Sequence, residues 1–421
     1  MNIAILGAGI IGVTTAYELA ADGHTVTVFE RHTSIGEEAS FANAGIIAAA
    51  GCVSDWSAPG IAGKLGRQIL TSNAPLRMAR PLRAADLGWM RRWLTASRSA
   101  NASVNQTRLM RLALYSQHRM REISASMAYT FDRSDGYMVL LRSEKNRRQI
   151  QPGLAALREL GVPFHEISAT EARQVEYALH PLTDLAGAIY FPQDEVANCR
   201  QFAIILRDAA EQLGARFEFS KSVASIDLTQ PATLRIANED SPRRFDAIVV
   251  CAGVQSASLL APLGIRLPLR PVYGYSISAH IPESLNAPRS GVMDEHYKVT
   301  ITRLGQRVRV AGAAEIGGRP GHMDDGAIRK LYKVLADWFP AAGRLSKGVQ
   351  VWKGASPALP DGSPVLGPSG IPGLWLNLGH GASGWTLACG SARILADQIG
   401  GRMPHIDIEG LGLERLMGSG Q

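Results

Sequence analysis

The fold is decided by the stretch Asn2-Ile-Ala-Ile-Leu-Gly-Ala-Gly-Ile-Ile-Gly-Val-Thr-Thr-Ala-Tyr-Glu-Leu-Ala-Ala-Asp-Gly-His-Thr-Val-Thr-Val-Phe-Glu30. Ile3 to Leu6 form a continuous apolar run, which is typical of a parallel strand buried on both faces. The run stops at a glycine-rich turn, the turn opens a helix, and residues 25–29 predict a second strand. These elements in this order predict a βαβ unit at the start of a parallel sheet.

The glycines of this stretch form the pattern G-x-G-x-x-G. Gly7 allows the tight turn, Gly9 lets a phosphate approach the backbone, and Gly12 lets the helix and strand pack closely. The N–H groups at the helix start then face a pyrophosphate. Glu30 ends the second strand where an acceptor for ribose hydroxyls belongs, and a carboxylate there disfavours the 2′-phosphate of NADP. The stretch predicts a dinucleotide site; the alternative is a structural βαβ unit with an empty crevice.

Composition indicates an ordinary globular protein. The 421 residues are 46% hydrophobic and 19% charged, which excludes disordered and fibrous classes and suits two interleaved domains. The first strand begins at residue 2, which leaves no room for a signal peptide, and no apolar run approaches the ~20 residues that span a bilayer. We therefore expect a cytoplasmic protein.

The cysteines argue against a metal or dithiol centre. Cys52, Cys199, Cys251 and Cys389 lie far apart, and no C-x-x-C occurs. We expect buried, reduced thiols and no bound metal.

The net charge of +7 and a pI near 9.3 favour anionic partners in general. Much of the excess lies in 76–83 and 89–94, where arginines alternate with Leu, Met and Trp. One interpretation is a segment that rests peripherally on the anionic inner face of a membrane. The other, which we favour, is a helix with Trp and Leu in the core and Arg outside. Nothing resembles a nucleic-acid-binding module.

Further along, the chain alternates between helical and strand-like blocks. Residues 34–45 are small and polar, as expected of a loop lying against a ligand. Residues 60–198 carry helices with Arg-rich outer faces, and 108–123 shows a helical apolar stripe. The remaining predicted elements are strands at 137–141, 188–191, 216–220, 223–226, 245–253, 271–278, 297–303 and 307–312, and a helix at 202–213.

A second signature occupies residues 352–391. A strand runs into Gly379-His-Gly-Ala-Ser-Gly384, and a helix of small residues follows. A second helix N-terminus therefore points at a ligand.

With these motifs the chain resembles the FAD-dependent D-amino-acid oxidase superfamily, and most closely the bacterial D-amino-acid dehydrogenase small subunits. Ser40-Phe-Ala-Asn-Ala-Gly45 matches the S-x-A-N-A-G segment that packs on the isoalloxazine in that family. Pro360-Asp-Gly-Ser-Pro-Val-Leu-Gly367 and Gly379–Thr386 match P-D-G-x-P-v-l-G and G-H-x-x-x-G-W-T, which bring the second helix start to the pyrimidine end of the flavin. The resemblance covers essentially the whole chain.

The resemblance implies an α/β fold in which two domains are interleaved. A Rossmann-type, glutathione-reductase-like FAD-binding domain with a parallel sheet takes residues 1–82, 199–267 and 348–421. An α+β substrate domain on a mainly antiparallel sheet takes 83–198 and 268–347. FAD fits better than NAD, which needs no second glycine-rich loop. The expected cofactor-binding residues are Gly7, Gly9, Ile10, Ile11, Gly12, Glu30, Arg31, Ser40, Asn43, Ala44, Gly45, Val223, Ala252, Gly253, Gly379, Gly381, Gly384, Trp385 and Thr386.

The resemblance also implies the reaction. Hydride leaves the Cα–H of an amine-bearing carbon for flavin N5, and the resulting imine is hydrolysed to a 2-oxo acid and ammonia. Tyr275 matches the family's tyrosine-bearing strand and Arg303 its Ile-Thr-Arg, so both are candidates for holding the substrate carboxylate. Tyr297 shares a strand face with Arg303 by the period of two, and both enter the flavin cavity if that face lines it. His380 is a further catalytic candidate, for which we favour a structural or cofactor-facing role.

One departure from the family concerns substrate binding. The family reads G-x-R-P before P-D-G, and its arginine clamps the carboxylate, whereas this chain reads Gly354-Ala-Ser356-Pro357. Serine supplies neither a charge nor a bidentate pair. Either Arg303 or Lys353 takes over this role, or the substrate is not an ordinary α-amino acid.

The leading functional hypothesis is an FAD-dependent dehydrogenase that oxidises a D-amino acid or related amine and passes electrons to a quinone or another acceptor. The alternatives are an oxidase that uses oxygen, a flavin-bearing electron-transfer subunit with a degenerate substrate site, and an NAD-binding dehydrogenase.

Overall fold

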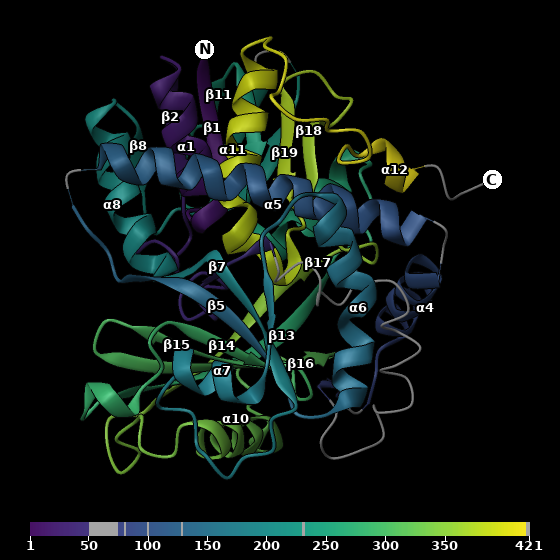
Figure 1. Ribbon diagram of the computed structural model, residues 1–421. Helices are drawn as coiled ribbons and strands as arrows, with labels where there is room; N and C mark the ends of the chain where they lie inside the picture. Colours follow the sequence, from purple (N-terminus) through teal and green to yellow (C-terminus); the bar gives the residue numbers. More distant parts are fainter. Residues whose placement is uncertain (50–74, 80, 99–100, 128, 230–231, 418–421) are drawn as a thin grey trace.

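A computed structural model of the chain describes residues 1–49, 75–79, 81–98, 101–127, 129–229 and 232–417. Two large sheets form two lobes, and both ends of the chain lie in the lobe drawn uppermost in Figure 1. This lobe contains the N-terminal βαβ unit, and the other contains most of the middle of the chain. The α/β fold with a parallel-rich and a mainly antiparallel sheet is confirmed.

The upper lobe is built on a six-stranded sheet in the order β18-β19-β12-β1-β2-β8. All neighbours pair in parallel except β18 with β19. Its strands are β1 (Asn2–Leu6), β2 (Thr25–Phe29), β8 (Arg216–Glu218), β12 (Ala247–Val250), β18 (Val365–Pro368) and β19 (Leu374–Leu378).

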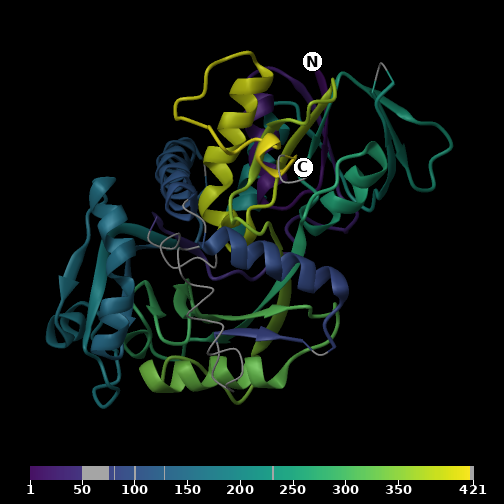
Figure 2. The ribbon, with the colours of Figure 1, turned by 90° about the vertical axis from the view of Figure 1, so that its right-hand side faces the viewer.

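Both faces of this sheet are covered, which explains the continuous apolar run of β1. Ile3 and Ile5 pack with three helices, α1 (Ile10–Ala21), α8 (Cys199–Gln212) and α11 (Gly384–Ile399). Ala4 and Leu6 face a small sheet and α9 (Ser256–Leu260). The small sheet consists of β9 (Val223–Asp227), β10 (Ala232–Ile236) and β11 (Arg243–Phe245), and it projects from the lobe on the side away from α5 (Figure 2).

The lower lobe is built on a ten-stranded, mainly antiparallel sheet in the order β17-β13-β16-β15-β14-β5-β7-β3, with β4 paired to β16 and β6 to β7. Its strands are β3 (Ile46–Ile47), β4 (Leu76–Met78), β5 (Arg133–Leu141), β6 (His165–Ile167), β7 (Gly187–Ala197), β13 (Arg270–His280), β14 (Gly291–Asp294), β15 (Val299–Leu304), β16 (Arg307–Ile316) and β17 (Gln350–Ala358). Helix α10 (Asp325–Trp338) covers its outer face with Leu331, Val334 and Trp338.

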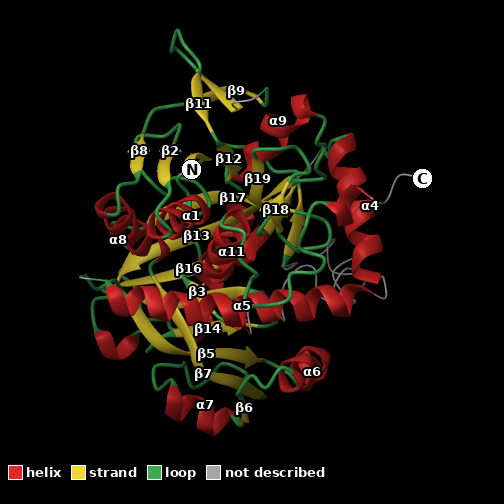
Figure 3. Cartoon of the chain, turned by 90° about the horizontal axis from the view of Figure 1, so that it is seen from above, coloured by secondary structure: helices red, strands yellow, loops and turns green. Residues whose placement is uncertain are grey.

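The other helices connect or flank the lobes. Helix α5 (Asn101–Ser126) crosses α11 on the surface of the upper lobe (Figure 3). Helix α4 (Ala84–Arg98) lies along the junction of the lobes (Figure 2); Trp89 and Trp93 are buried, whereas Arg91 and Arg92 are exposed, as the favoured interpretation of this segment predicts. The rest are α6 (Glu144–Glu159), α7 (Ala169–Val175) and α12 (Glu414–Met417).

Strand pairing departs from the predicted domain boundaries. β17 pairs with β13, and β3 and β4 also join the ten-stranded sheet, although these strands come from the segments predicted for the FAD-binding domain. The predicted boundaries at residues 82 and 348 therefore separate strands that pair with each other. The reason is that a strand pattern in the sequence shows that a segment is a strand but not which distant strand it pairs with.

The predictions for the cysteines and for membrane-spanning segments can be compared with the described part of the chain. Cys199, Cys251 and Cys389 are buried free thiols, and burial raises the pKa of Cys199 and Cys251 to about 12; Cys52 lies outside the described residues. None of the described helices is long and apolar enough to span a bilayer.

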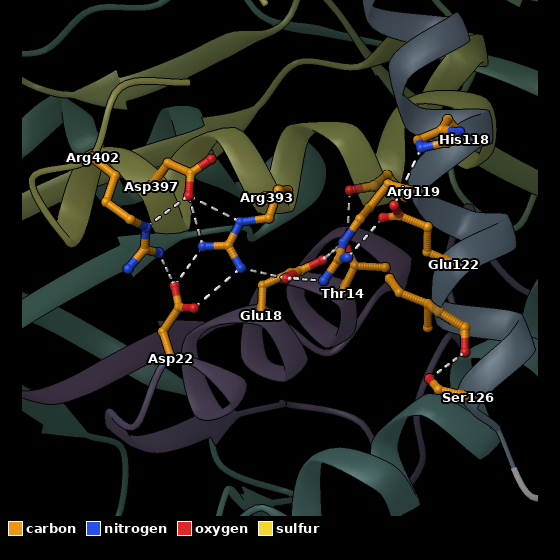
Figure 4. A network of polar contacts seen from close by, with 12 residues as sticks. Thr14, Glu18, Asp22, His118, Arg119, Glu122, Ser126, Arg393, Asp397 and Arg402 are labelled. Carbon is orange, nitrogen blue, oxygen red and sulfur yellow. Dashed lines mark hydrogen bonds and ion pairs between the residues drawn. The ribbon is translucent and has the colours of Figure 1, made fainter. Parts of the chain in front are cut away.

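A buried ion network joins three helices of the upper lobe (Figure 4). The side chain of Glu18 on α1 is fully buried. Its carboxylate accepts from Nε of Arg119 on α5 at 2.7 Å and from Nη1 of Arg393 on α11 at 2.7 Å. Arg393 also pairs with Asp22, the residue that follows α1, and with Asp397. Each charge has an opposite partner whose attraction offsets its desolvation, and the network fixes α1 against α5 and α11.

Glu18→Gln should destabilise the protein by about 3–5 kcal/mol, because it leaves two partly buried arginines facing a neutral amide. The measurement is the shift of the urea unfolding midpoint. Glu122→Gln is the matched control: Glu122 also pairs with Arg119, but its side chain is 48% exposed, and we expect a loss below about 1 kcal/mol. Equal losses in the two variants would contradict a special role for the buried carboxylate.

Candidate active site

A crevice of about 190 Å³ lies at the carboxyl end of the six-stranded sheet. It is bounded by the residues that follow β1, β2, β12 and β19, and by the starts of α1 and α11. In open parallel sheets this edge is where dinucleotides bind. The predicted residues on its wall are Gly7, Gly9, Ile10, Ile11, Glu30, Arg31, Ser40, Asn43, Val223, Ala252, Gly253, Gly379, Gly381, Gly384 and Trp385.

The three glycines of the first turn have distinct steric roles. Gly7 has φ +103°, a left-handed conformation that favours glycine. A Cβ on Gly12 would lie 1.9 Å from the Gly7 carbonyl oxygen, so Gly12 lets α1 pack on β1. A Cβ on Gly9 would meet only Ser40 Oγ, at 3.6 Å, and otherwise would point into open space on the crevice wall. The surrounding protein therefore leaves room for a side chain at position 9, on the side where a ligand would lie.

The polar groups of the crevice suit an anionic ligand with ribose hydroxyls. Helix α1 has no acidic residue in its first turn; the N–H of Ile10, its first residue, donates to Ser40 Oγ at 3.0 Å, and the positive potential of the helix start is directed at the crevice. Glu30 accepts from the backbone N–H of Ala8 at 2.7 Å and of His32 at 2.9 Å, one bond to each oxygen. Each carboxylate oxygen keeps a free lone pair for a ribose hydroxyl. The crevice residues therefore fit the FAD that the sequence predicts.

The start of α11 forms the opposite wall of the crevice. It has no side-chain cap and, like α1, no acidic residue in the first turn. His380, just before it, is buried and bonds through Nε2 to Ser391 Oγ at 3.1 Å. Burial lowers the pKa of His380 to about 3, so the imidazole is neutral near pH 7. The contact with Ser391 gives this ring a role in holding the loop against α11, and so weak a base is unsuited to taking a substrate proton.

A second cavity, of about 280 Å³, adjoins the crevice. The two share wall residues, among them Asn43, Ser356 and Trp385. The inner face of the ten-stranded sheet lines it on one side, and the segment that contains Ala44 and Gly45, together with Thr386, lines it on the other. Ser276 Oγ donates to the Ala42 carbonyl at 2.8 Å and ties that segment to β13. The walls are mostly apolar, as expected of a small-molecule site.

Tyr275 lies on the wall of this cavity, as part of a buried polar cluster. Its hydroxyl donates to Glu315 Oε2 at 2.6 Å, and Lys353 Nζ donates to the same oxygen at 2.8 Å. Burial and Glu315 together raise the pKa of Tyr275, so the phenol keeps its proton. Lys353 also donates to the carbonyls of Arg319 and His322, so its three donors are used within the protein. Lys353 therefore does not replace the arginine that is missing at residue 356.

The prediction that Tyr297 and Arg303 enter the cavity is wrong. Tyr297 lies on the other side of the sheet, with Lys333 of α10 5.2 Å from its ring centroid, and Arg303 donates to Ser284 Oγ at 3.1 Å. One face of the sheet packs against α10 and the other lines the cavity. Because neither face is open to water, the alternation of residues alone does not tell which face meets the cavity. Thr300 and Lys298 line it instead, and sequence analysis missed both, as it missed Tyr137 on β5.

Comparison with known proteins also indicates an FAD-dependent enzyme. Residues 2–398 match the protein family described as FAD dependent oxidoreductase. The chain is 39% identical over 417 residues to a D-amino acid dehydrogenase of Rhizobium johnstonii, covering 99% of this chain and 100% of that protein. It is 40% identical over 423 residues to one of Cereibacter sphaeroides, covering 100% and 97%. Its fold matches glycine oxidase from Geobacillus kaustophilus with a TM-score of 0.77 at 22% identity, covering 98% of both chains.

Gly9→Ala should leave the protein folded and lower its FAD affinity by about tenfold or more, because the added methyl group projects only toward the ligand. The measurement is flavin retained per protein after dialysis, with circular dichroism as the check of folding. Gly12→Ala is the matched comparison and should fail to fold, since its Cβ meets backbone. A Gly9→Ala protein with full flavin content would show that the crevice binds its ligand elsewhere.

His380→Gln should make stability less sensitive to acid. The unfolded imidazole takes a proton below about pH 6.5, whereas the buried one resists until about pH 3. The His380 contribution is therefore complete above pH 6.5 and decreases as the pH falls, by about 2 kcal/mol at pH 5. Urea midpoints at pH 7.5 and pH 5.0 measure the difference. The same loss in both proteins would mean that other groups cause the acid sensitivity.

Proposed function

The chain belongs to the family of FAD dependent oxidoreductases, and on this premise we propose that it is a D-amino acid dehydrogenase. In this function the substrate loses a hydride from Cα to give an iminium, and water then converts the iminium to a 2-oxo acid and ammonium. The names of the relatives at 39% and 40% identity over nearly the full length support this proposal.

One structural observation carries the proposal: a mostly apolar cavity with a few polar groups adjoins the dinucleotide crevice. Trp89, Trp93 and Ile316 form its apolar end. Such walls suit an amino acid with an apolar side chain, because a charged side chain there would be desolvated without a partner.

The protein's own residues contribute orientation and electrostatics. FAD, when bound, supplies the hydride acceptor. The uncapped start of α11 stabilises negative charge placed near it. Tyr275 has its proton held by Glu315, so a lone pair of its oxygen is free to accept a hydrogen bond from the substrate amine. Enclosing Cα in this cavity supplies proximity, which accounts for much of the rate in a reaction with little acid–base chemistry.

We further propose that the electron acceptor is a quinone, reached by a cytoplasmic protein resting peripherally on the inner face of the membrane. Helix α4 is compatible with this view: Trp89 and Trp93 are buried against the protein and line the cavity, but Leu87, Arg91 and Arg92 of the same helix are exposed. Exposed arginines next to an apolar side chain suit an anionic lipid surface.

An anaerobic absorbance titration tests the function. We expect the flavin band of the purified protein to bleach with D-alanine, D-methionine and D-phenylalanine but not with their L-enantiomers. Re-oxidation by a soluble quinone without peroxide would identify a dehydrogenase, and rapid re-oxidation by oxygen with peroxide would identify an oxidase. A band that no amino acid bleaches would overturn the substrate assignment and favour an electron-transfer role.

A further inference from the structure

The cavity presents a charge problem that bears on the proposed amino-acid substrate. An amino acid brings a carboxylate, which needs a cationic partner when it leaves water. Residue 356 is a serine, Arg303 lies on the opposite side of the sheet, and Lys353 is held by Glu315. Among the described residues that line the cavity, Lys298 is the one charged side chain.

Lys298 is held in an unusual conformation at this position. Its φ is +52°, a left-handed value that is uncommon for a residue other than glycine. Such outliers persist only where the surroundings enforce them, and they occur often at functional sites. The residue lies between Tyr297, which packs on the α10 side, and Val299, the first residue of β15.

The surroundings that enforce this conformation are visible. Asp294 is buried, and its Oδ1 accepts the backbone N–H groups of His296 at 3.0 Å and Tyr297 at 3.1 Å. Its Oδ2 accepts from Arg142 at 2.7 Å and from Trp338 of α10 at 2.7 Å. The turn before β15 is thus fixed from the outer face of the sheet, and Lys298 is carried to the inner face.

The neighbouring strand is shaped to admit Lys298. A Cβ on Gly312 of β16 would lie 2.7 Å from the Lys298 carbonyl oxygen, so only glycine allows this approach. Gly312 itself lines the cavity. The strained backbone of Lys298, just before β15, and the close approach of Gly312 on β16 therefore occur at the same place, beside the one charged group among the described residues of the wall.

The ammonium group of Lys298 pairs with one carboxylate and has hydrogen-bond donors left over. Nζ lies 2.5 Å from Glu295 Oε1, and the Lys298 side chain is 15% exposed. An ammonium has three donors, so two remain after the bond to Glu295. Tyr137 and Thr300 line the same cavity, and the buried Tyr137 hydroxyl lies within hydrogen-bond reach of the Thr300 side chain. A ligand oxygen placed there satisfies both the phenol and the lysine.

From this arrangement we infer that Lys298 binds the substrate carboxylate, in place of the arginine that is missing at residue 356. The inference rests on the proposed amino-acid substrate. It places the carboxylate beside Tyr137 and Thr300 and directs the side chain toward Ile316, four residues from Gly312 along β16, or about 13 Å at ~3.3 Å per residue.

Binding of matched probes to the FAD-loaded protein tests the inference without turnover. The probes are phenylacetate and its neutral analogue phenylacetamide, measured by calorimetry. Lys298→Met should weaken phenylacetate binding by about 10- to 100-fold and change phenylacetamide binding less than about twofold, because one charged hydrogen bond is lost. Lys298→Arg should keep most of the phenylacetate affinity. KM for D-amino acids should rise with the phenylacetate constant, while kcat changes less.

Two controls keep the result interpretable. Lys298→Met leaves Glu295 without its partner, so Lys298→Met combined with Glu295→Gln removes both charges and should show the same selective loss. Lys333→Met removes a lysine that pairs with Asp337 at 2.7 Å on α10, behind the sheet, and should change neither probe.

Three outcomes would overturn the inference: unchanged phenylacetate binding in Lys298→Met, equal weakening of both probes, or a wild-type protein that oxidises D-amino acids without binding phenylacetate. Failure of the proposed function looks different. In that case no amino acid bleaches the flavin, whereas the Lys298-dependent preference for phenylacetate over phenylacetamide persists.

Discussion

The pairing of Glu18 with Arg119 and Arg393 is the interaction on which the rest of the structure depends. It joins α1, α5 and α11 away from the ends that bound the crevice. The starts of α1 and α11 both reach the crevice, and neither helix has an acidic residue in its first turn, so their partial positive charges act on the same region. Two helix N-termini directed at one region carry an electrostatic cost until an anion arrives. An ion network remote from the ligand lets the protein hold this arrangement before the anion binds.

Much of the fold could be predicted because its signals are local. Strands β1 and β2 agree with the predicted 3–6 and 25–29 to within a residue, and the predicted helix at 202–213 lies within a few residues of α8. Buried strands, glycine turns and amphipathic helices can be predicted from residues that are close together in the sequence. The glycine pattern predicted a crevice wall for the same reason, since Gly7 and Gly12 are required by steric contacts at the turn itself.

The cavity that adjoins the crevice could not be predicted to the same degree, because its composition depends on distant packing. Alternation correctly grouped Tyr297 with Arg303, but α10 covers that side of the sheet and the cavity takes the other. The aspartate before Lys298 is a recognisable turn signal, yet the turn is fixed by Arg142 and Trp338 from other elements. The absence of the expected arginine at residue 356 was visible in the sequence, whereas the presence of Lys298 on the cavity wall was not.

The strand order of the six-stranded sheet also has a consequence for biosynthesis. β1 pairs on one side with β12, and β12 pairs with β19, so residues 2–6 find their final surroundings only after residues 247–250 and 374–378 have left the ribosome. At ~5–20 residues per second the first strand waits for tens of seconds, with its apolar side chains and one hydrogen-bonding edge uncovered. A nascent chain in this state is a substrate for chaperones. The crevice wall includes Gly384 and Trp385, so the complete crevice forms only after these residues have been translated, late in the synthesis of the chain.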